Sequence, residues 1–296
     1  MSLRCFAPDA EAAEALPGSI WAVLLPGGTE RWNYWDAHPP GSTCAWSFAA
    51  FLVARGIGVV AWDTFGLGDS HSRGHCSELN FELLVEAHAQ VVATLRDKLL
   101  TGCLLLELAA MRPIIAGIGH SGGGALAVGL QGDHACFDLL TVLGMPAGAF
   151  GGPADDSEPQ DIREMTATDS DGLLHLPMTA SGRAVQFLAD VPDAVVAWFE
   201  SQMVPLLPGQ LSNMLPGEVA SRAAQVTVPT FLGFGEVDFA LEPLMERDYY
   251  GRCSDLTIWI QPGSGHGHHL SLRRTQISDA IFSWIWGRTR QLKIGR

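Results

Sequence analysis

Gly119, His120, Ser121, Gly122 and Gly123 have the types and the spacing needed to present a reactive serine. An apolar run precedes them and a run of small residues follows, so we expect a strand to turn directly into a helix at Ser121. In a G-x-S-x-G turn of this kind, the nucleophile elbow, the serine lies on a strained backbone that holds its hydroxyl above the sheet. The flanking glycines give strand and helix room to pack closely. The pattern predicts a nucleophile at Ser121.

The same stretch, starting at Gly117, also fits G-x-G-x-x-G, the phosphate-binding turn of dinucleotide folds. That turn usually lies in the first βα unit, with an acid at the end of the next strand. Here two strand patterns come earlier, and the nearest acid, Asp138, lies at the start of the next strand. A glycine-rich turn without chemistry is a further alternative. We favour the elbow because its context fits better.

A serine is a poor nucleophile unless a histidine takes its proton and a carboxylate orients that histidine. In parallel α/β sheets such groups gather at the carboxyl ends of strands. Asp238 follows one predicted strand and His266 follows the last, which gives the chain order serine, acid, histidine. Glu236 remains an alternative acid, and His268 and His269 remain alternative bases. No nearby cysteine or carboxylate completes a ligand set for the three histidines, so we expect no metal and no cofactor.

Hydrophobic periodicity indicates the elements that position these residues. Short apolar runs that stop at turn residues predict strands at 19–25, 58–62, 113–118, 139–143, 226–234 and 256–260. Apolar residues at three- and four-residue spacing predict helices at 48–55, 83–99 and 273–286, and the small residues 124–130 predict another. Alternating strands and helices predict an α/β fold with a mostly parallel sheet covered on both faces.

Between residues 151 and 225 the apolar strand patterns disappear, and prolines, glycines and acids accumulate. We expect a cap (lid) at 151–225, inserted into a core of residues 1–150 and 226–296. The segment holds eleven acidic and three basic residues, a net charge of −8. Over a pocket this charge would disfavour anionic substrates, whereas on an outer surface it would only attract water. The apolar residues that could line the inner face are Met178, Phe187, Val195, Val196, Trp198, Phe199, Met203 and Leu206.

Five motifs in this order resemble the α/β-hydrolase superfamily over nearly the whole chain. They are the turn 25–28, the loop 63–70 with its two spaced glycines, the elbow, and the turns that end in Asp238 and His266. The resemblance implies an α/β-hydrolase fold with a helical cap inserted after the sixth strand, and an esterase-like serine hydrolase. Many members have His-Gly at the first turn, where this chain has Pro26-Gly27.

For the site, the resemblance implies a catalytic triad of Ser121, Asp238 and His266. The oxyanion hole would consist of the backbone N–H groups of Gly122 and Gly28, with Thr29 as the alternative to Gly28.

An apolar pocket is expected between the tryptophan-rich loop that follows this turn and the cap. Trp32, His120 and Trp198 are the candidate substrate-binding residues. For His120, inside the elbow, we expect packing rather than acid–base chemistry.

The expected activity is cleavage of a carboxylic ester or lactone in a largely neutral, hydrophobic small molecule, through an acyl-enzyme. The same residues also support hydrolysis of carbon–carbon, thioester or amide bonds, because a fold does not define a substrate. Two hypotheses come from other classes of protein. One is a non-catalytic small-molecule receptor on this fold, and the other is a nucleotide-dependent oxidoreductase that uses the glycine pattern.

Composition narrows the partners. The 296 residues carry a net charge of −14, which argues against nucleic acid and anionic membrane surfaces as partners. The six cysteines are scattered without C-x-x-C spacing and indicate reduced thiols in a cytoplasmic protein. No signal-peptide pattern and no apolar run of membrane-spanning length are present, so no membrane insertion is expected. A homo-oligomer is compatible with the sequence.

Overall fold

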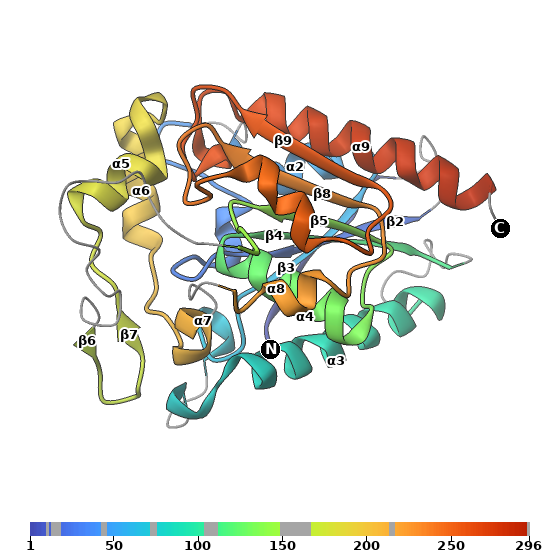
Figure 1. Ribbon diagram of the computed structural model, residues 1–296, viewed down its shortest axis with the longest axis horizontal. Coiled ribbons are helices and arrows are strands. Elements are labelled where there is room, and N and C mark those ends of the chain that lie inside the picture. Colours follow the sequence, from blue (N-terminus) through green and yellow to red (C-terminus); the bar gives the residue numbers. More distant parts are fainter. Residues whose placement is uncertain are drawn as a thin grey trace.

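The computed structural model describes residues 1–9, 12, 19–42, 46–71, 76–103, 112–148, 167–212 and 217–294. Its centre is a seven-stranded sheet in the order β1-β3-β2-β4-β5-β8-β9 (Figure 1). The strands are β1 (Leu3–Phe6), β2 (Ile20–Leu25), β3 (Gly58–Trp62), β4 (Ile114–His120), β5 (Leu139–Leu143), β8 (Thr230–Gly235) and β9 (Leu256–Gln261). β1 runs antiparallel to β3, and all other neighbours are parallel. The predicted α/β-hydrolase fold is thus confirmed, and β1 is an additional edge strand that the sequence analysis did not predict.

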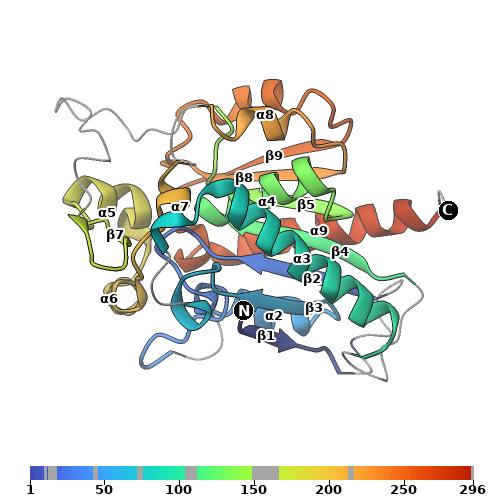
Figure 2. The same cartoon turned by 90° about the horizontal axis from the view of Figure 1, so that it is seen from below.

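Helices cover both faces of the sheet (Figures 1 and 2). One face carries α3 (Phe81–Leu100), α4 (Gly122–His134) and the short α8 (Ala220–Ala223), and the other carries α2 (Phe48–Val53) and α9 (Arg274–Ile294). The side chain of Asn80 caps α3, and Ser47 caps α2, each accepting a bond from a backbone N–H of the first turn. α9 continues past the predicted end at 286, and in this last part Arg288 pairs with Asp255 through two hydrogen bonds of 3.0 and 2.7 Å.

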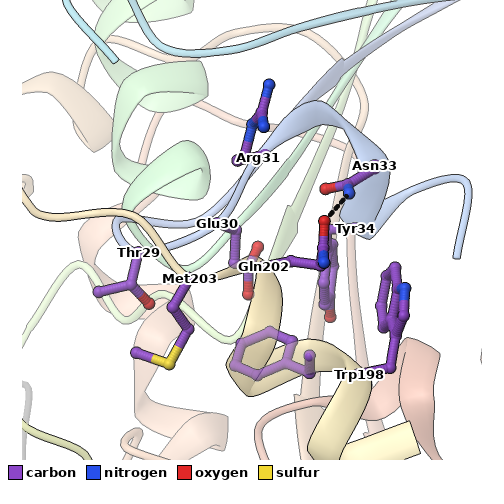
Figure 3. Close-up of a pocket in the computed structure, with 9 residues that line it drawn as sticks. Thr29, Glu30, Arg31, Asn33, Tyr34, Trp198, Gln202 and Met203 are labelled. Atoms are coloured by element: carbon purple, nitrogen blue, oxygen red, sulfur yellow. Dashed lines mark hydrogen bonds between the residues drawn. The ribbon is translucent and has the colours of Figure 1, made fainter. Parts of the chain in front are cut away.

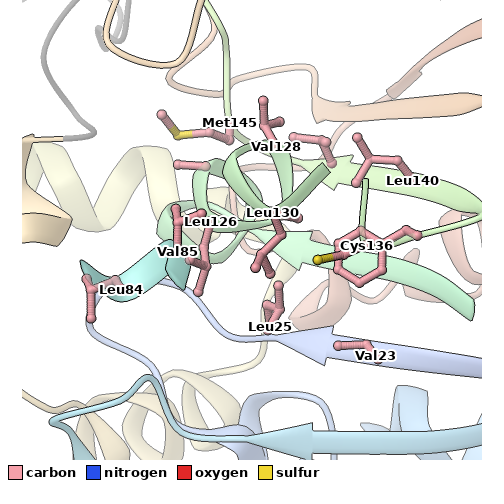
Figure 4. Packing of buried hydrophobic residues seen from close by; sticks show 14 of the residues in the cluster. Val23, Leu25, Leu84, Val85, Leu126, Val128, Leu130, Cys136, Leu140 and Met145 are labelled. Atoms are coloured by element: carbon pink, nitrogen blue, oxygen red, sulfur yellow. The ribbon is translucent and has the colours of Figure 1, made fainter. Parts of the chain in front are cut away.

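β2 shows why the sheet needs both layers. Its six residues are all buried, and alternate side chains point to opposite faces. Trp21, Val23 and Leu25 belong to the core under α3 and α4, whereas the other three residues belong to the core under α2 and α9. Figure 4 shows the first of these cores, where residues of α4 such as Leu130 pack over β2. Leu130 has no exposed surface, so its truncation to alanine should cost about 2 to 5 kcal/mol.

The chain leaves the sheet after β5 and forms a separate layer beside it, seen in yellow at the left of Figures 1 and 2. This layer contains the small hairpin of β6 (Ala167–Thr168) and β7 (Leu174–His175), then α5 (Ala180–Phe187), α6 (Asp193–Gln202) and α7 (Pro208–Ser212). The expected insertion point was after the sixth strand, but β5 is only the fifth described strand of the chain. The cap boundaries 151 and 225 stay predictions, and residues 149–166, with five of the eleven cap acids, lie outside the described residues.

Short 3₁₀ helices occur in several connections. They are η1 (Trp32–Tyr34), η3 (Gly68–Ser70), η4 (Cys76–Glu78), η6 (Leu188–Asp190), η7 (Pro243–Tyr249) and η8 (His268–Leu270). Five cysteines fall within the described residues: Cys5, Cys103, Cys136 and Cys253 are free thiols, and Cys76 is buried. Cys44 lies outside the described residues. No helix in the described ranges has the length and apolar character needed to cross a bilayer.

Candidate active site

Ser121 lies between the end of β4 and the start of α4, in a backbone conformation that few side chains adopt. Its φ is 50° and its ψ −123°, a strained region that costs about 1 to 3 kcal/mol. Two neighbouring glycines make the turn possible. A Cβ on Gly119 would lie 2.1 Å from the carbonyl oxygen of Gly123, and a Cβ on Gly123 would lie 2.3 Å from the carbonyl oxygens of Leu25 and Pro26. The geometry is that of a nucleophile elbow.

The alternative phosphate-binding turn does not fit this geometry. The space beside Gly117 is filled by the ring of Phe137, which would be 2.5 Å from a Cβ at that position. Asp138, the acid nearest to the pattern, accepts a 3.0 Å hydrogen bond from the backbone N–H of Ile115. Ile115 is at the start of β4, so Asp138 lies at the opposite end of that strand from Ser121.

Asp238 and His266 meet in a buried pair beyond the carboxyl ends of β8 and β9. The distance from His266 Nδ1 to Asp238 Oδ1 is 2.6 Å, and His266 is 2% and Asp238 5% exposed. Asp238 also accepts bonds from the backbone N–H groups of Gly235 at 2.9 Å and Phe239 at 2.7 Å. Burial raises the pKa of this carboxyl, but the charge and hydrogen bond of His266, assisted by His268 and Gly235, outweigh it and lower the pKa to about 2. Asp238 is therefore ionised at neutral pH and can hold His266 with a proton on Nδ1.

The competing acid and bases lie elsewhere. Glu236 is exposed and accepts a 2.6 Å bond from the backbone N–H of Gly263. His268 directs Nδ1 to the carbonyl of Gly265 at 3.2 Å and lies 3.9 Å from Asp238. Burial lowers the pKa of His268 to about 3. His269 packs among aromatic rings, 4.5 Å from Phe48 between ring centroids.

His266 lies over the turn that supports Ser121. A Cβ on Gly144 would be 2.6 Å from Cε1 of His266, so only glycine leaves room for the ring. The preceding residue, Leu143, accepts a 2.7 Å hydrogen bond from the backbone N–H of Ser121. The structure therefore brings the serine, the histidine and the aspartate to one end of the sheet, although they are far apart in the sequence.

α5 holds the loop that carries His266. The backbone N–H groups of His266 and Gly267 donate to the carbonyls of Val185 and Gln186 at 2.9 and 2.7 Å. A Cβ on Gly265 would lie 2.4 Å from the carbonyl oxygen of Val185. The glycines on both sides of His266 thus allow the helix to approach the loop.

The two expected oxyanion-hole residues are adjacent. A Cβ on Gly122 would lie 3.0 Å from the backbone nitrogen of Gly28. Among the described residues, neither backbone N–H has a hydrogen-bond acceptor. Leu206 covers the turn, with its Cδ2 2.5 Å from where a Cβ of Gly28 would be. Two unpaired donors at one place are what a developing oxyanion requires.

A small cavity opens beside this turn, with about 10 Å³ of space, enough for roughly one water molecule. Its walls are Thr29, Glu30, Arg31, Asn33, Tyr34, Trp198, Phe199, Gln202 and Met203 (Figure 3). Trp198 lies in the wall with two apolar cap residues, Phe199 and Met203, and its role in substrate binding stays a prediction. Trp32 is not in it; its ring packs against Arg4 and Phe6 of β1 instead.

His120 differs most from the expectation of a substrate contact. It has no exposed surface, and both ring nitrogens are engaged: Nδ1 with Glu30 at 2.9 Å and Nε2 with the carbonyl of His266 at 2.9 Å. Its ring stacks on Tyr34 at 4.7 Å between centroids. The sequence analysis missed Glu30, Asn33, Tyr34 and Gln202 at this site. An acid three residues after a glycine turn gives no signal of a partner ninety residues away.

A protein-family model is similar to most of this chain. A model described as the alpha/beta hydrolase family matches residues 22–280. No curated protein is significantly similar in sequence.

Several solved structures are similar in fold. A monoacylglycerol lipase from Paleococcus ferrophilus aligns at a TM-score of 0.62 and 17% identity, covering 97% of this chain and 99% of the lipase. An enol-lactonase from Burkholderia xenovorans LB400 aligns at 0.61 and 15%, covering 96% and 95%. A proline iminopeptidase from Mycobacterium smegmatis aligns at 0.56 and 16%, covering 94% and 92%. At these identities the likeness shows a shared fold and says nothing about the substrate of this chain.

Proposed function

The chain belongs to the alpha/beta hydrolase family, and we propose that it is a serine hydrolase that cleaves a carboxylic ester or lactone of a neutral, hydrophobic small molecule. One observation carries the proposal. The strained Ser121 lies at the end of β4. The 2.6 Å pair of His266 and Asp238 and the unpaired N–H groups of Gly28 and Gly122 lie at the same end of the sheet.

The proposed reaction gives each of these groups a role. His266 removes the proton from Ser121 while Asp238 keeps the ring oriented and stabilises the imidazolium that forms. The serine oxygen attacks the carbonyl carbon, and the N–H groups of Gly122 and Gly28 bind the negative oxygen. His266 then protonates the leaving alkoxide, and a water, activated by the same histidine, releases the acid from the acyl-enzyme.

The surroundings of the nucleophile support a neutral, apolar substrate. The cap contributes Trp198, Phe199 and Met203 to the cavity wall, and Leu206 covers the turn of Gly28. Six of the eleven cap acids lie within the described residues, against two arginines. We propose that residues 151–225 act as the cap of the pocket. The cavity holds roughly one water and none of its lining residues belongs to the triad, so we propose that α6 shifts to open the site to substrate.

A fluorophosphonate probe tests the proposal, because it reacts covalently with an activated serine. The wild type should be labelled at Ser121, and the Ser121→Ala variant should fold but remain unlabelled. Esters of graded chain length, with matched amides and thioesters, then identify the scissile bond. Folded wild-type protein that resists labelling and cleaves none of these compounds would favour the non-catalytic receptor.

A further inference from the structure

Glu30 and His120 form a second carboxylate–imidazole pair directly beside the first. Glu30 is 6% exposed and His120 is fully buried, and Oε1 of the glutamate is 2.9 Å from Nδ1 of the histidine. The ring centroids of His120 and His266 are 4.6 Å apart. The reaction proposed above assigns no role to this pair.

The partners of His120 define its protonation. Nδ1 faces a carboxylate oxygen and Nε2 faces the carbonyl oxygen of His266, and both of these oxygens are acceptors. With Glu30 ionised, each ring nitrogen carries a proton, and the pair is an imidazolium and a carboxylate. Burial lowers the pKa of His120, but the charge and hydrogen bond of Glu30 outweigh it and raise the pKa above 6.5. Within the described part of the chain, the other titratable groups that interact with this ring are Tyr34, Asp238, His266, His268 and His269.

The pair connects both halves of the candidate active site. The second oxygen of Glu30 accepts a 2.6 Å hydrogen bond from the backbone N–H of Gly27. A further bond, from the N–H of Glu30 to the carbonyl of Gly27 at 3.2 Å, closes the turn with Gly28 at its centre. On the other side, Nε2 of His120 holds the carbonyl of His266. The turn of the oxyanion hole and the loop of the base are thus fastened to one imidazolium, in the residue that precedes the serine.

We propose that Glu30 and His120 are positioning residues that hold the Gly28 N–H and the His266 ring in register with Ser121. This inference rests on the proposed function of the site. Its consequence is specific: loss of the pair should lower kcat much more than it changes KM, because the misplaced groups act on the transition state. A misplacement of about 1 Å can cost roughly 100-fold in rate.

Glu246 offers a matched control. It is 5% exposed and accepts hydrogen bonds from two backbone N–H groups, Ala147 at 2.6 Å and Gly148 at 3.4 Å, neither of which belongs to the triad or to the oxyanion turn. Truncating Glu246 removes a buried carboxylate with similar backbone partners. Any effect of Glu30→Ala beyond that of Glu246→Ala therefore reports positioning rather than general stability.

The experiment compares wild type, Glu30→Ala, Glu30→Gln, His120→Asn and Glu246→Ala. It measures kcat and KM on an ester that the wild type cleaves, the rate of fluorophosphonate labelling, and the NMR resonance of the His266 ring N–H. We expect Glu30→Ala and His120→Asn to lose about 10- to 100-fold in kcat and labelling rate, with KM within about threefold. Glu30→Gln keeps an acceptor for the Gly27 N–H and should recover part of the loss. In Glu246→Ala, kcat should stay within about twofold of wild type and the His266 resonance should not move.

The outcomes separate this inference from the proposed function. Equal losses of kcat in Glu30→Ala and Glu246→Ala, or none in either, would overturn the positioning role. If Glu30→Ala does not fold, Glu30→Gln decides: slower labelling with a shifted His266 resonance supports the role, and wild-type values overturn it. A wild type that the probe does not label overturns the proposed function instead. The His266 resonance then tests the positioning role of Glu30 and His120 independently of activity. It should still move in Glu30→Gln, and an unmoved resonance overturns the inference.

Discussion

Replacing Asp238 with asparagine tests the acid of the triad with the smallest change in shape. In the wild type both oxygens of Asp238 accept: one from His266 and from the N–H of Phe239, the other from the N–H of Gly235. An asparagine has one accepting oxygen and one NH₂ group, so in either orientation its NH₂ faces at least one N–H donor. An unsatisfied buried donor costs about 1 to 3 kcal/mol, and the variant should be destabilised by that amount.

Catalysis should suffer far more than stability. If the NH₂ group faces His266, the ring must place its proton on Nε2, and it can then no longer accept the proton of Ser121. If the oxygen faces His266, the tautomer survives, but the negative charge that stabilises the imidazolium is gone. The equivalent change in a serine protease with this triad lowers kcat about 10⁴-fold, and we expect a loss of that order here.

The acid stability of the protein should change in a defined direction. The pKa of Asp238 is lowered from 3.8 to about 2, so its contribution to the free energy of unfolding is present above pH 3.8 and is lost as the pH falls through about 2. The difference in pKa corresponds to about 2 kcal/mol. The difference in unfolding free energy between wild type and Asp238→Asn should therefore narrow as the pH falls from 3.8 to about 2.

The assay is kcat and fluorophosphonate labelling for Asp238→Asn and for the matched control Glu236→Gln, with urea unfolding of both. Glu236 is exposed, and a glutamine oxygen can still accept from the N–H of Gly263, so the control should retain nearly full activity and stability. Should Glu236→Gln be the more damaging change, the assignment of the acid would be wrong and the reasoning from the 2.6 Å contact with His266 would fail.

Three further predictions concern the oxyanion turn, the second pair and the cap. Gly28→Ala places a Cβ 2.5 Å from Leu206 and should lower kcat and cost about 1 to 3 kcal/mol in stability. Adding Leu206→Ala should restore part of both, and no recovery in kinetics or urea unfolding would exclude this clash as the cause. Because the pKa of His120 is raised above 6.5, its contribution to stability is complete below pH 6.5 and is lost as the pH rises through the raised value. The difference in unfolding free energy between wild type and His120→Gln should therefore shrink as the pH rises, and a constant difference would contradict this. Neutral esters should have a higher kcat/KM than carboxylate-bearing analogues of similar size, and the ratio should narrow with salt, since screening acts over about 8 Å at physiological ionic strength; equal values at low salt would leave the cap acids without a steering role.

The sequence alone was sufficient to predict the fold, and it supplied the candidate positions of the chemical groups. Short apolar runs that stop at glycine-containing turns are local signals, and they located β2, β3, β4, β5, β8 and β9 to within a few residues. The predicted triad residues all lie at strand ends, because a parallel sheet brings the carboxyl ends of its strands to one edge. β1 escaped prediction because it is a four-residue edge strand whose side chains are exposed or only half-buried, so it carries no buried apolar run.

Only the tertiary structure decided which way the side chains point and which distant residues meet. Glu236 and Asp238 are equivalent as letters, and it is the turn after β8 that directs one to the solvent side of Gly263 and the other to His266. Trp32 and Trp198 are both candidate wall residues by composition, but only the packing of α6 places Trp198 at the cavity. Such choices depend on contacts between segments that no local pattern encodes.

The pair of Glu30 and His120 is the clearest case of this limit. Each residue has an ordinary place in the sequence, one in a turn and the other inside the elbow, and nothing in either neighbourhood indicates the other. They become a pair because β2 and β4 are neighbouring parallel strands, whose ends bring the glycine turn and the elbow together. Burial then makes each charge depend on the other, since an unpaired ion in the core would be strongly destabilising. Local residue chemistry thus determined the candidate nucleophile and its partners, while the neighbourhood of β2 and β4 determined what surrounds them.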